Sequence, residues 1–217
     1  MLSFAPVLQT PSRCTVLCFG AHCDDIEIGC GGTLLKLAES GIRMDCHWVV
    51  ATSNEQRETE CRRSAALFLA GAARFEVTTW QFRDGFLPYL GVEVKEAFER
   101  IKREISPDVI FTHYRDDLHQ DHRLVNNLTW NTFRDHFILE YEIPKYDGDF
   151  SSPNFYVPIT DAHCRRKGEY LMQCYESQRS HRWFTEETFR SVMRLRGVEV
   201  GSPTGYAEGF YARKVMW

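Results

Sequence analysis

The sequence lacks any apolar run long enough to span a bilayer, and its first residues, MLSFAPVLQTPSRC, contain no apolar segment behind a basic start. Neither a transmembrane helix nor a signal peptide is therefore expected, and a cytoplasmic location is predicted. The chain also lacks an internal repeat, a low-complexity tract or a linker that would separate a second domain. A length of 217 residues fits a single domain spanning residues 1–217 with a sizeable core.

A CxxC pair is absent too, although the chain has eight cysteines. Because no secretion is expected, reduced thiols are predicted rather than a disulfide framework. The scattered spacing does not fit a zinc knuckle built of thiolates. Most of these residues are predicted to be small core side chains: Cys14, Cys18, Cys23, Cys30, Cys46, Cys61, Cys164 and Cys174.

Excess basic charge is missing as well, since the net charge is −4. This balance argues against nucleic acid or an anionic membrane as the main partner. Hydrophobic residues at 43% and charged residues at 26% are typical of a soluble globular protein. A homo-oligomer is compatible with the sequence.

Short apolar runs alternate with amphipathic stretches along the chain. Strands are predicted at residues 15–19, 44–52, 75–80, 108–113, 137–143 and 154–160, and near 207–217. Helices are predicted at residues 31–41, 54–71, 92–105, 121–136, 162–178 and 185–197. This alternation predicts an α/β fold, a Rossmann-like three-layer α/β/α sandwich with a mostly parallel sheet.

A glycine-rich turn follows the first predicted strand, which is the context of a dinucleotide-binding loop. A GxGxxG pattern starting at Gly29 requires glycine where Leu34 stands, and no Walker lysine follows. Three acidic residues just before the turn would also repel a pyrophosphate. A dinucleotide site is therefore excluded, and Gly31 and Gly32 are expected to let the helix pack closely on the sheet.

Three polar residues, His22, Asp24 and Asp25, come directly after this strand. Ligands of open α/β sheets bind beyond the carboxyl ends of the strands. His22 and Asp25 are three positions apart across a tight turn, so their side chains can meet on one metal ion. Asp24 points elsewhere and can stand beside the ion. A structural histidine at a strand end is the alternative for an isolated His22.

The same residue types recur in HYRDDLHQDH, which follows the strand predicted at residues 108–113. His119, Asp121 and His122 can meet there at the start of a helix. With the first cluster they provide two nitrogens and one carboxylate oxygen, which, with a water, form the ligand set of an open catalytic zinc site. Asp116 and Asp117 are also explained by a solvated, charged loop.

The two clusters resemble the paired motifs of the LmbE/PIG-L family of zinc-dependent N-deacetylases. The segment AHCDDI resembles the family's AHPDDE, and HQDH resembles its HPDH or HxDH, in the same order and each after a predicted strand. The resemblance covers most of the chain and is loosest over residues 137–180. Three more segments resemble family patterns: Arg57–Glu60 its RxxE, Asp84–Gly85 its acidic turn and Tyr206–Phe210 its YAExF.

The resemblance implies a residue role at each matching position. One zinc ion per chain would be held by His22, Asp25 and His122. Asp24 would be the general base, His119 the protonated partner of the developing charge and Asp121 the carboxylate that orients it.

The chain departs from the family pattern at two positions. Cys23 replaces the usual proline and Ile26 the usual glutamate. No implied ligand or base is missing, so an active enzyme is expected. Cys23 as an additional zinc ligand is the alternative.

For the substrate, the resemblance implies an N-acetylated amino sugar that is free, glycosidic, lipid-linked or nucleotide-linked. Arg57 would meet a phosphate or carboxylate, and Glu60 and Asp84 would accept sugar hydroxyls. The alternative for Arg57 and Glu60 is an ion pair along one helix. Aromatic residues can stack on a sugar or belong to the core: Trp183, Phe184 and Tyr206.

Two other function classes fit a metal site of this kind. One is a metallohydrolase such as a phosphoesterase, which typically needs bridging carboxylates and a larger ligand set. The other is a non-catalytic zinc-binding protein.

Overall fold

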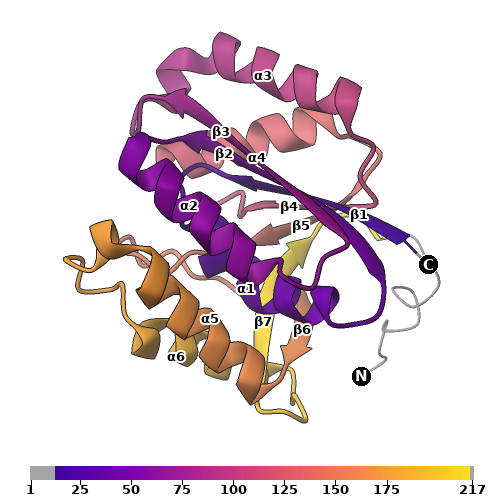
Figure 1. Cartoon of the computed structure of the whole chain (residues 1–217), viewed down its shortest axis with the longest axis vertical. Coiled ribbons are helices and arrows are strands. Elements are labelled where there is room, and N and C mark those ends of the chain that lie inside the picture. Colours follow the sequence, from indigo (N-terminus) through magenta and orange to yellow (C-terminus); the bar gives the residue numbers. More distant parts are fainter. Residues whose placement is uncertain (1–12, 216–217) are drawn as a thin grey trace.

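One seven-stranded sheet forms the centre of the protein (Figure 1). The structure is a computed structural model that describes residues 13–215. The strand order is β3-β2-β1-β4-β5-β7-β6, and β7 alone runs opposite to the other six strands. The strands are β1 (Arg13–Gly20), β2 (Arg43–Thr52), β3 (Arg74–Phe82), β4 (Val109–His113), β5 (Phe137–Tyr141), β6 (Phe155–Ile159) and β7 (Tyr206–Ala212).

Helices cover both faces of the sheet, so the expected three-layer α/β/α sandwich is confirmed. Helices α3 and α4 lie on one face, and α1, α2, α5 and α6 lie on the other (Figure 1). Their bounds are α1 (Asp25–Ala38), α2 (Glu55–Phe68), α3 (Gly91–Glu104), α4 (Gln120–Thr132), α5 (Asp161–Cys174) and α6 (Glu186–Glu199). Two short 3-10 helices, η2 (Leu87–Leu90) and η3 (Glu176–Gln178), interrupt the connecting loops.

Two of the expectations from the sequence concern the ends of the chain. The segment in which no signal peptide is expected lies, apart from Arg13 and Cys14, outside the described residues, as do the last two residues of the expected final strand. Within residues 13–215, no helix is both long and apolar enough to cross a membrane.

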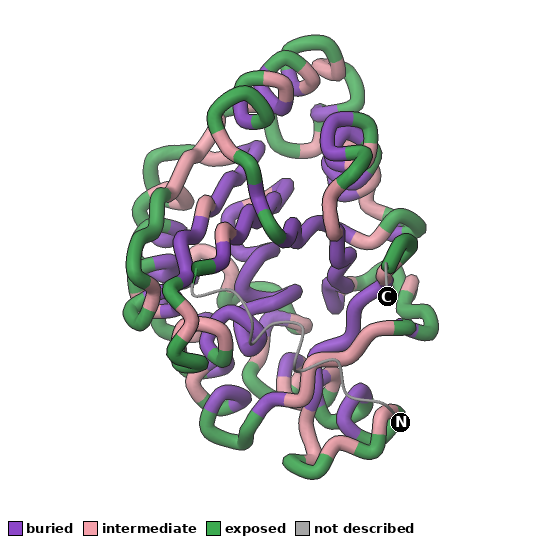
Figure 2. Tube along the Cα trace, turned by 90° about the vertical axis from the view of Figure 1, so that its right-hand side faces the viewer, coloured by how far each residue is buried: buried purple, intermediate pink, exposed green. Residues whose placement is uncertain are grey.

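The sheet separates two hydrophobic cores, and the strands between them are mostly buried (Figure 2). Under α3 and α4, Phe19 stacks on Phe98 with ring centroids 4.4 Å apart. On the opposite face, Trp48, Phe68 and Tyr141 lie in the larger core. All eight cysteines are free and buried, as the sequence predicted.

Side-chain caps fix the starts of several helices. The Asn54 side chain accepts a hydrogen bond from the backbone of Arg57 at the start of α2. At the start of α5, Thr160 and His163 form a reciprocal capping box. These local signals explain why the expected and observed boundaries of α2 and α5 agree within a few residues.

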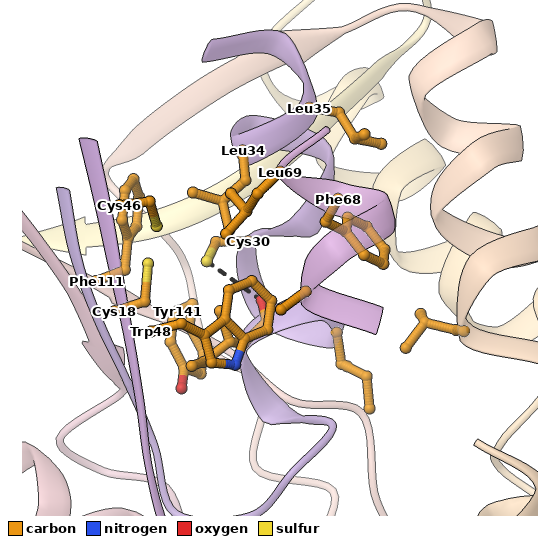
Figure 3. Close-up of a cluster of buried hydrophobic side chains, with 14 of the residues drawn as sticks. Cys18, Cys30, Leu34, Leu35, Cys46, Trp48, Phe68, Leu69, Phe111 and Tyr141 are labelled. Carbon is orange, nitrogen blue, oxygen red and sulfur yellow. Dashed lines mark hydrogen bonds between the residues drawn. The ribbon is translucent and has the colours of Figure 1, made fainter. Parts of the chain in front are cut away.

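Gly31 and Gly32 of α1 allow two close contacts, which confirms the expected packing on the sheet for Gly32, whereas Gly31 packs against helix α2. A Cβ at Gly31 would lie 2.6 Å from the Phe68 ring on α2, and one at Gly32 would lie 2.9 Å from a carboxylate oxygen of Glu208 on β7. That carboxylate accepts hydrogen bonds from the backbone N–H groups of Gly32 and Thr33, at 2.8 and 2.6 Å. Figure 3 shows the neighbouring part of this core, where Cys30 of α1 packs against Cys18 and Trp48 of the sheet. Glycine at position 32 thus lets an acidic side chain reach the helix backbone.

Candidate metal centre

The two polar clusters meet where the strand order of the sheet reverses direction. Strands β1 and β4 are parallel neighbours, and their carboxyl ends lie at the same edge. After β1 the chain enters α1 on one face, whereas after β4 it enters α4 on the other face. A crevice at such a switch point is the usual ligand site of an open α/β sheet.

The side chains of the three predicted metal ligands converge in this crevice. His22 Nδ1 lies 3.1 Å from His122 Nε2 and 3.2 Å from Asp25 Oδ2. His122 Nε2 lies 3.5 Å from the other carboxylate oxygen of Asp25, Oδ1. Ligand atoms around a tetrahedral zinc ion lie roughly 3.3 Å apart, given zinc–nitrogen distances of about 2.0–2.1 Å. The separations and the donor types therefore fit a cation of this size.

Further histidine and aspartate side chains surround the same point. Three groups have ligand atoms close enough together to hold a metal ion: His22–His119–His122, Asp25–His113–His122 and His22–Asp84–Asp121. The first two groups share His122, and the first and third share His22. His113 was not singled out in the sequence, because it reads as the last residue of a buried strand.

The Asp25 carboxylate has several polar neighbours in the crevice. Its Oδ2 accepts a hydrogen bond from the backbone of His22 at 2.7 Å and lies 3.1 Å from His113 Nε2. Burial raises the pKa of Asp25, but His122, His113 and His22 outweigh it and hold the pKa well below its usual range. The carboxylate is therefore ionised, which is the state that binds a cation.

The imidazoles of His22 and His122 differ in their surroundings. Burial, together with the neighbouring His113, lowers the pKa of His122 to about 3, so this ring is neutral. Burial also lowers the pKa of His22, but Asp25 and Asp121 outweigh it, and the pKa lies well above its ordinary value. His22 Nε2 points toward Asp84, with Oδ1 at 3.1 Å.

Asp117 is a site residue that sequence reasoning missed. It is 2% exposed, and its Oδ2 lies 2.9 Å from His122 Nδ1, so the solvated-loop explanation is wrong for this residue. That explanation is right for Asp116, whose side chain is 68% exposed. Adjacent aspartates give no sequence signal of which one turns inward, because the loop backbone decides the direction of each side chain.

His119 and Asp121 lie at the start of α4, but the carboxylate of Asp121 is not directed at His119. His119 Nδ1 accepts a hydrogen bond from the backbone of Asp121 at 3.3 Å. The Asp121 carboxylate accepts from the backbone of Gly85 at 2.7 Å and of Leu87 at 3.1 Å. The expected orienting contact is thus made by the backbone, while the carboxylate holds the 85–87 loop. Burial and the neighbouring His22 lower the pKa of His119.

Asp24 lies beside the predicted metal ligands and pairs with Arg57. Its Oδ1 accepts a hydrogen bond from the Arg57 guanidinium at 2.7 Å. Burial raises the pKa of Asp24, although Arg57 opposes the rise. Glu60, one helical turn after Arg57, accepts two hydrogen bonds from Ser177 instead. The alternative of an Arg57–Glu60 ion pair is therefore wrong.

Cys23 and the three aromatic residues pack away from the cluster. The Cys23 thiol donates to the carbonyl of Thr52 at 3.5 Å, and it belongs to none of the possible metal-binding groups within residues 13–215. Phe184 is buried, Trp183 packs against the core, and Tyr206 packs beneath the Arg190 guanidinium. These contacts indicate packing roles.

Comparisons with known proteins find a de-N-acetylase family and a deacetylase among the relatives of this chain. Residues 17–133 match the family model "PIG-L: GlcNAc-PI de-N-acetylase". The chain is 32% identical over 156 residues to the "Uncharacterized deacetylase YaiS" of Escherichia coli (strain K12), an alignment that covers 66% of this chain and 82% of that protein.

Solved structures with the same fold include enzymes of two reaction types. The N,N'-diacetylchitobiose deacetylase of Pyrococcus horikoshii matches with a TM-score of 0.70 and 23% identity, covering 97% of this chain and 87% of that one. The 4-carboxy-2-hydroxymuconate hydratase GalB of Pseudomonas putida KT2440 matches with a TM-score of 0.72 and 17% identity, covering 94% and 97%. At these identities the likeness shows the fold alone.

Proposed function

Because the chain belongs to the LmbE/PIG-L family of de-N-acetylases, we propose that it is a zinc-dependent hydrolase acting on an N-acetylated amino sugar. The reaction would release acetate and a free amine. A cytoplasmic location, which eight unpaired thiols favour, belongs to the same proposal.

One observation carries the proposal: His22, Asp25 and His122 bring two nitrogens and a carboxylate together in the crevice. Three protein ligands leave one position of a tetrahedral ion for water or substrate, which is typical of a catalytic zinc site. When bound there, zinc would lower the pKa of a coordinated water and polarise the amide carbonyl.

The remaining site residues suit the proton transfers of amide hydrolysis. Asp24 is placed beside the metal ligands and would accept the proton of the attacking water. His119 accepts a backbone hydrogen bond at Nδ1, so its Nε2 carries the proton and is free to donate. That N–H would stabilise the negative oxygen that develops on the amide carbon. Asp24 or His119 would then protonate the departing amine.

The substrate-binding roles belong to Asp84, Arg57 and Glu60. The Asp84 side chain is 77% exposed at the rim of the crevice, where its carboxylate can accept a sugar hydroxyl. Arg57 and Glu60 already hold Asp24 and Ser177. Their side chains are therefore already ordered before substrate binds. Binding would cost these side chains little conformational freedom, which favours affinity.

The fold by itself does not select a hydrolase, since the same fold carries a hydratase. A phosphoesterase of the two-metal type typically needs a bridging carboxylate, and no carboxylate belongs to two of the three possible metal-binding groups within residues 13–215. Metal stoichiometry separates these classes: one zinc ion per chain favours the deacetylase.

The test measures metal content and acetate release together. We expect one zinc ion per chain and acetate release from at least one member of a panel of free, glycosidic and nucleotide-linked N-acetyl sugars. Chelation should abolish the release and added zinc restore it. The substitution His122→Ala should remove both zinc and activity, whereas His47→Ala, on β2 beside Glu76, should leave both unchanged.

Two results would overturn the proposal. A full zinc complement in folded His122→Ala would contradict the ligand assignment. Stoichiometric zinc with no acetate release from any amide would instead favour the non-catalytic zinc-binding protein.

A further inference from the structure

The loop between β4 and α4 is largely exposed, but it contains one buried carboxylate, Asp117, that contacts both histidines of the HQDH segment. Asp117 Oδ2 lies 2.9 Å from His122 Nδ1, and its Oδ1 accepts a hydrogen bond from the backbone of His119 at 2.8 Å. One side chain therefore links the proposed metal ligand to the proposed oxyanion donor. Both contacts are short, and the aspartate is 2% exposed.

The orientation of the His122 ring shows how the contact with Asp117 affects this histidine. Its Nε2 faces His22 and Asp25, so the Nε2 lone pair is on the metal side. Its Nδ1 must then carry the proton, and this N–H donates a hydrogen bond to Asp117. A metal-binding histidine held by a carboxylate in this way has a fixed tautomer and a more basic ligand nitrogen.

Asp117 is itself held in place by a second loop. The Lys145 ammonium lies 3.1 Å from Asp117 Oδ2, and the Lys145 side chain is 9% exposed. Lys145 also pairs with Asp149, whose carboxylate accepts from the backbone of Leu118 at 2.7 Å. The positive charge of Lys145 offsets the cost of burying Asp117, and the hydrogen bond from Leu118 to Asp149 ties the two loops together.

From this geometry we infer that Asp117 is a positioning residue, which presents the Nε2 lone pair of His122 to the metal and sets the direction of His119. Lys145 and Asp149 form the support that holds its carboxylate. The inference rests on the proposed function for the identity of the metal, but the orientation of His122 belongs to the chain itself.

The experiment compares Asp117→Asn and Asp117→Ala with Asp116→Asn as the matched control. Asp116 is the adjacent aspartate, and its exposed carboxylate accepts from the Tyr114 hydroxyl rather than from a histidine. Zinc affinity, measured by competition with a chromogenic chelator, should fall by roughly 10–100-fold in the Asp117 variants. It should remain at the wild-type value in Asp116→Asn. Asn keeps an acceptor for the His122 proton, so Asp117→Asn should lose less affinity than Asp117→Ala.

A second measurement on the metal-free protein keeps this inference separate from the proposed function. Nitrogen-15 chemical shifts of His122 should report the Nδ1–H tautomer in wild type and a mixture of tautomers in Asp117→Ala. If both Asp117 variants unfold at lower temperature but keep wild-type zinc affinity and the single tautomer, Asp117 only stabilises the loop and the inference is wrong. Failure of the proposed function would appear differently, as absence of acetate release with normal zinc affinity and a normal tautomer.

Discussion

At the scale of single residues, the adjacent carboxylates Asp24 and Asp25 have different partners. Asp25 faces three imidazoles, whereas Asp24 faces the guanidinium of Arg57. If Asp24 and Asp25 only formed a negative patch, they would not require different and specific partners. The contacts therefore favour different roles, in which Asp25 binds the metal and Asp24 accepts a proton.

Substitution by asparagine tests this division, since it keeps the shape of each side chain but removes its charge. In Asp24→Asn, zinc should remain bound while kcat/KM falls by roughly 10²–10⁴-fold, the effect typical of a positioned acid–base group. In Asp25→Asn, zinc affinity should fall first and activity as a consequence. Zinc content and acetate release measured on the same samples distinguish the two. Near-normal turnover of Asp24→Asn with full zinc would remove Asp24 from the mechanism.

Site residues can be found from the sequence when they lie together in a short segment with a recognisable pattern. His22, Asp25, His119 and His122 stand in two short segments, so their types and spacing are readable without a fold. The partner of Arg57 is not readable, because it lies 33 positions away and meets Arg57 only after α2 packs beside the β1–α1 turn.

At the scale of elements, helix α1 differs most from its expected course. The glycine-rich stretch predicted a helix beginning near Gly31, but α1 begins at Asp25 and contains Gly29, Gly31 and Gly32. Glycine disfavours a helix by about 1 kcal/mol per residue relative to alanine. Here tertiary contacts outweigh that preference, because the absent side chains make room for the Tyr141 ring, Phe68 and Glu208.

A pair of glycine-to-alanine substitutions tests this explanation. A Cβ at Gly29 would lie 2.1 Å from the buried Tyr141 ring, so Gly29→Ala should destabilise the fold by roughly 1–3 kcal/mol. Gly91 has helical backbone angles and open space around it, so Gly91→Ala should stabilise the fold by about 0.4–1 kcal/mol. Thermal unfolding measures both, at roughly 2–4 °C per kcal/mol for a chain of this size. Equal shifts of the same sign would show that helix propensity, rather than the Tyr141 contact, governs position 29.

At the scale of the whole molecule, the strand order brings the site together. The alternation of strands and helices predicted the parallel sheet, and the apolar runs located its strands. That β1 lies between β2 and β4 follows from long-range packing, which a local pattern does not contain. Because β1 and β4 are neighbours, residues 22–25 lie beside residues 113–122, and the two polar clusters form one site.

The same packing encloses every thiol of the chain in a folded interior. All eight cysteines are buried, and Figure 3 shows Cys18, Cys30 and Cys46 within one hydrophobic cluster. Cys14 is the most accessible of the eight at only 6% exposed, and burial, followed by the charge of Asp108, raises its pKa to about 11. At pH 8 roughly one thousandth of such a thiol is the reactive thiolate.

Thiol labelling therefore reports whether the described interior is closed in solution. At pH 8, the zinc-loaded protein should react with an aromatic disulfide reagent at fewer than one thiol per chain within minutes, whereas the denatured chain should react at all eight. Labelled positions can be assigned by mass spectrometry of peptides. Cys23 is the informative residue, because its thiol packs in the core although its neighbours Asp24 and His22 belong to the crevice. Rapid labelling of Cys23 in the folded protein would show that the turn after β1 opens to solvent, and that the proposed metal ligands on it are not held rigidly by the core.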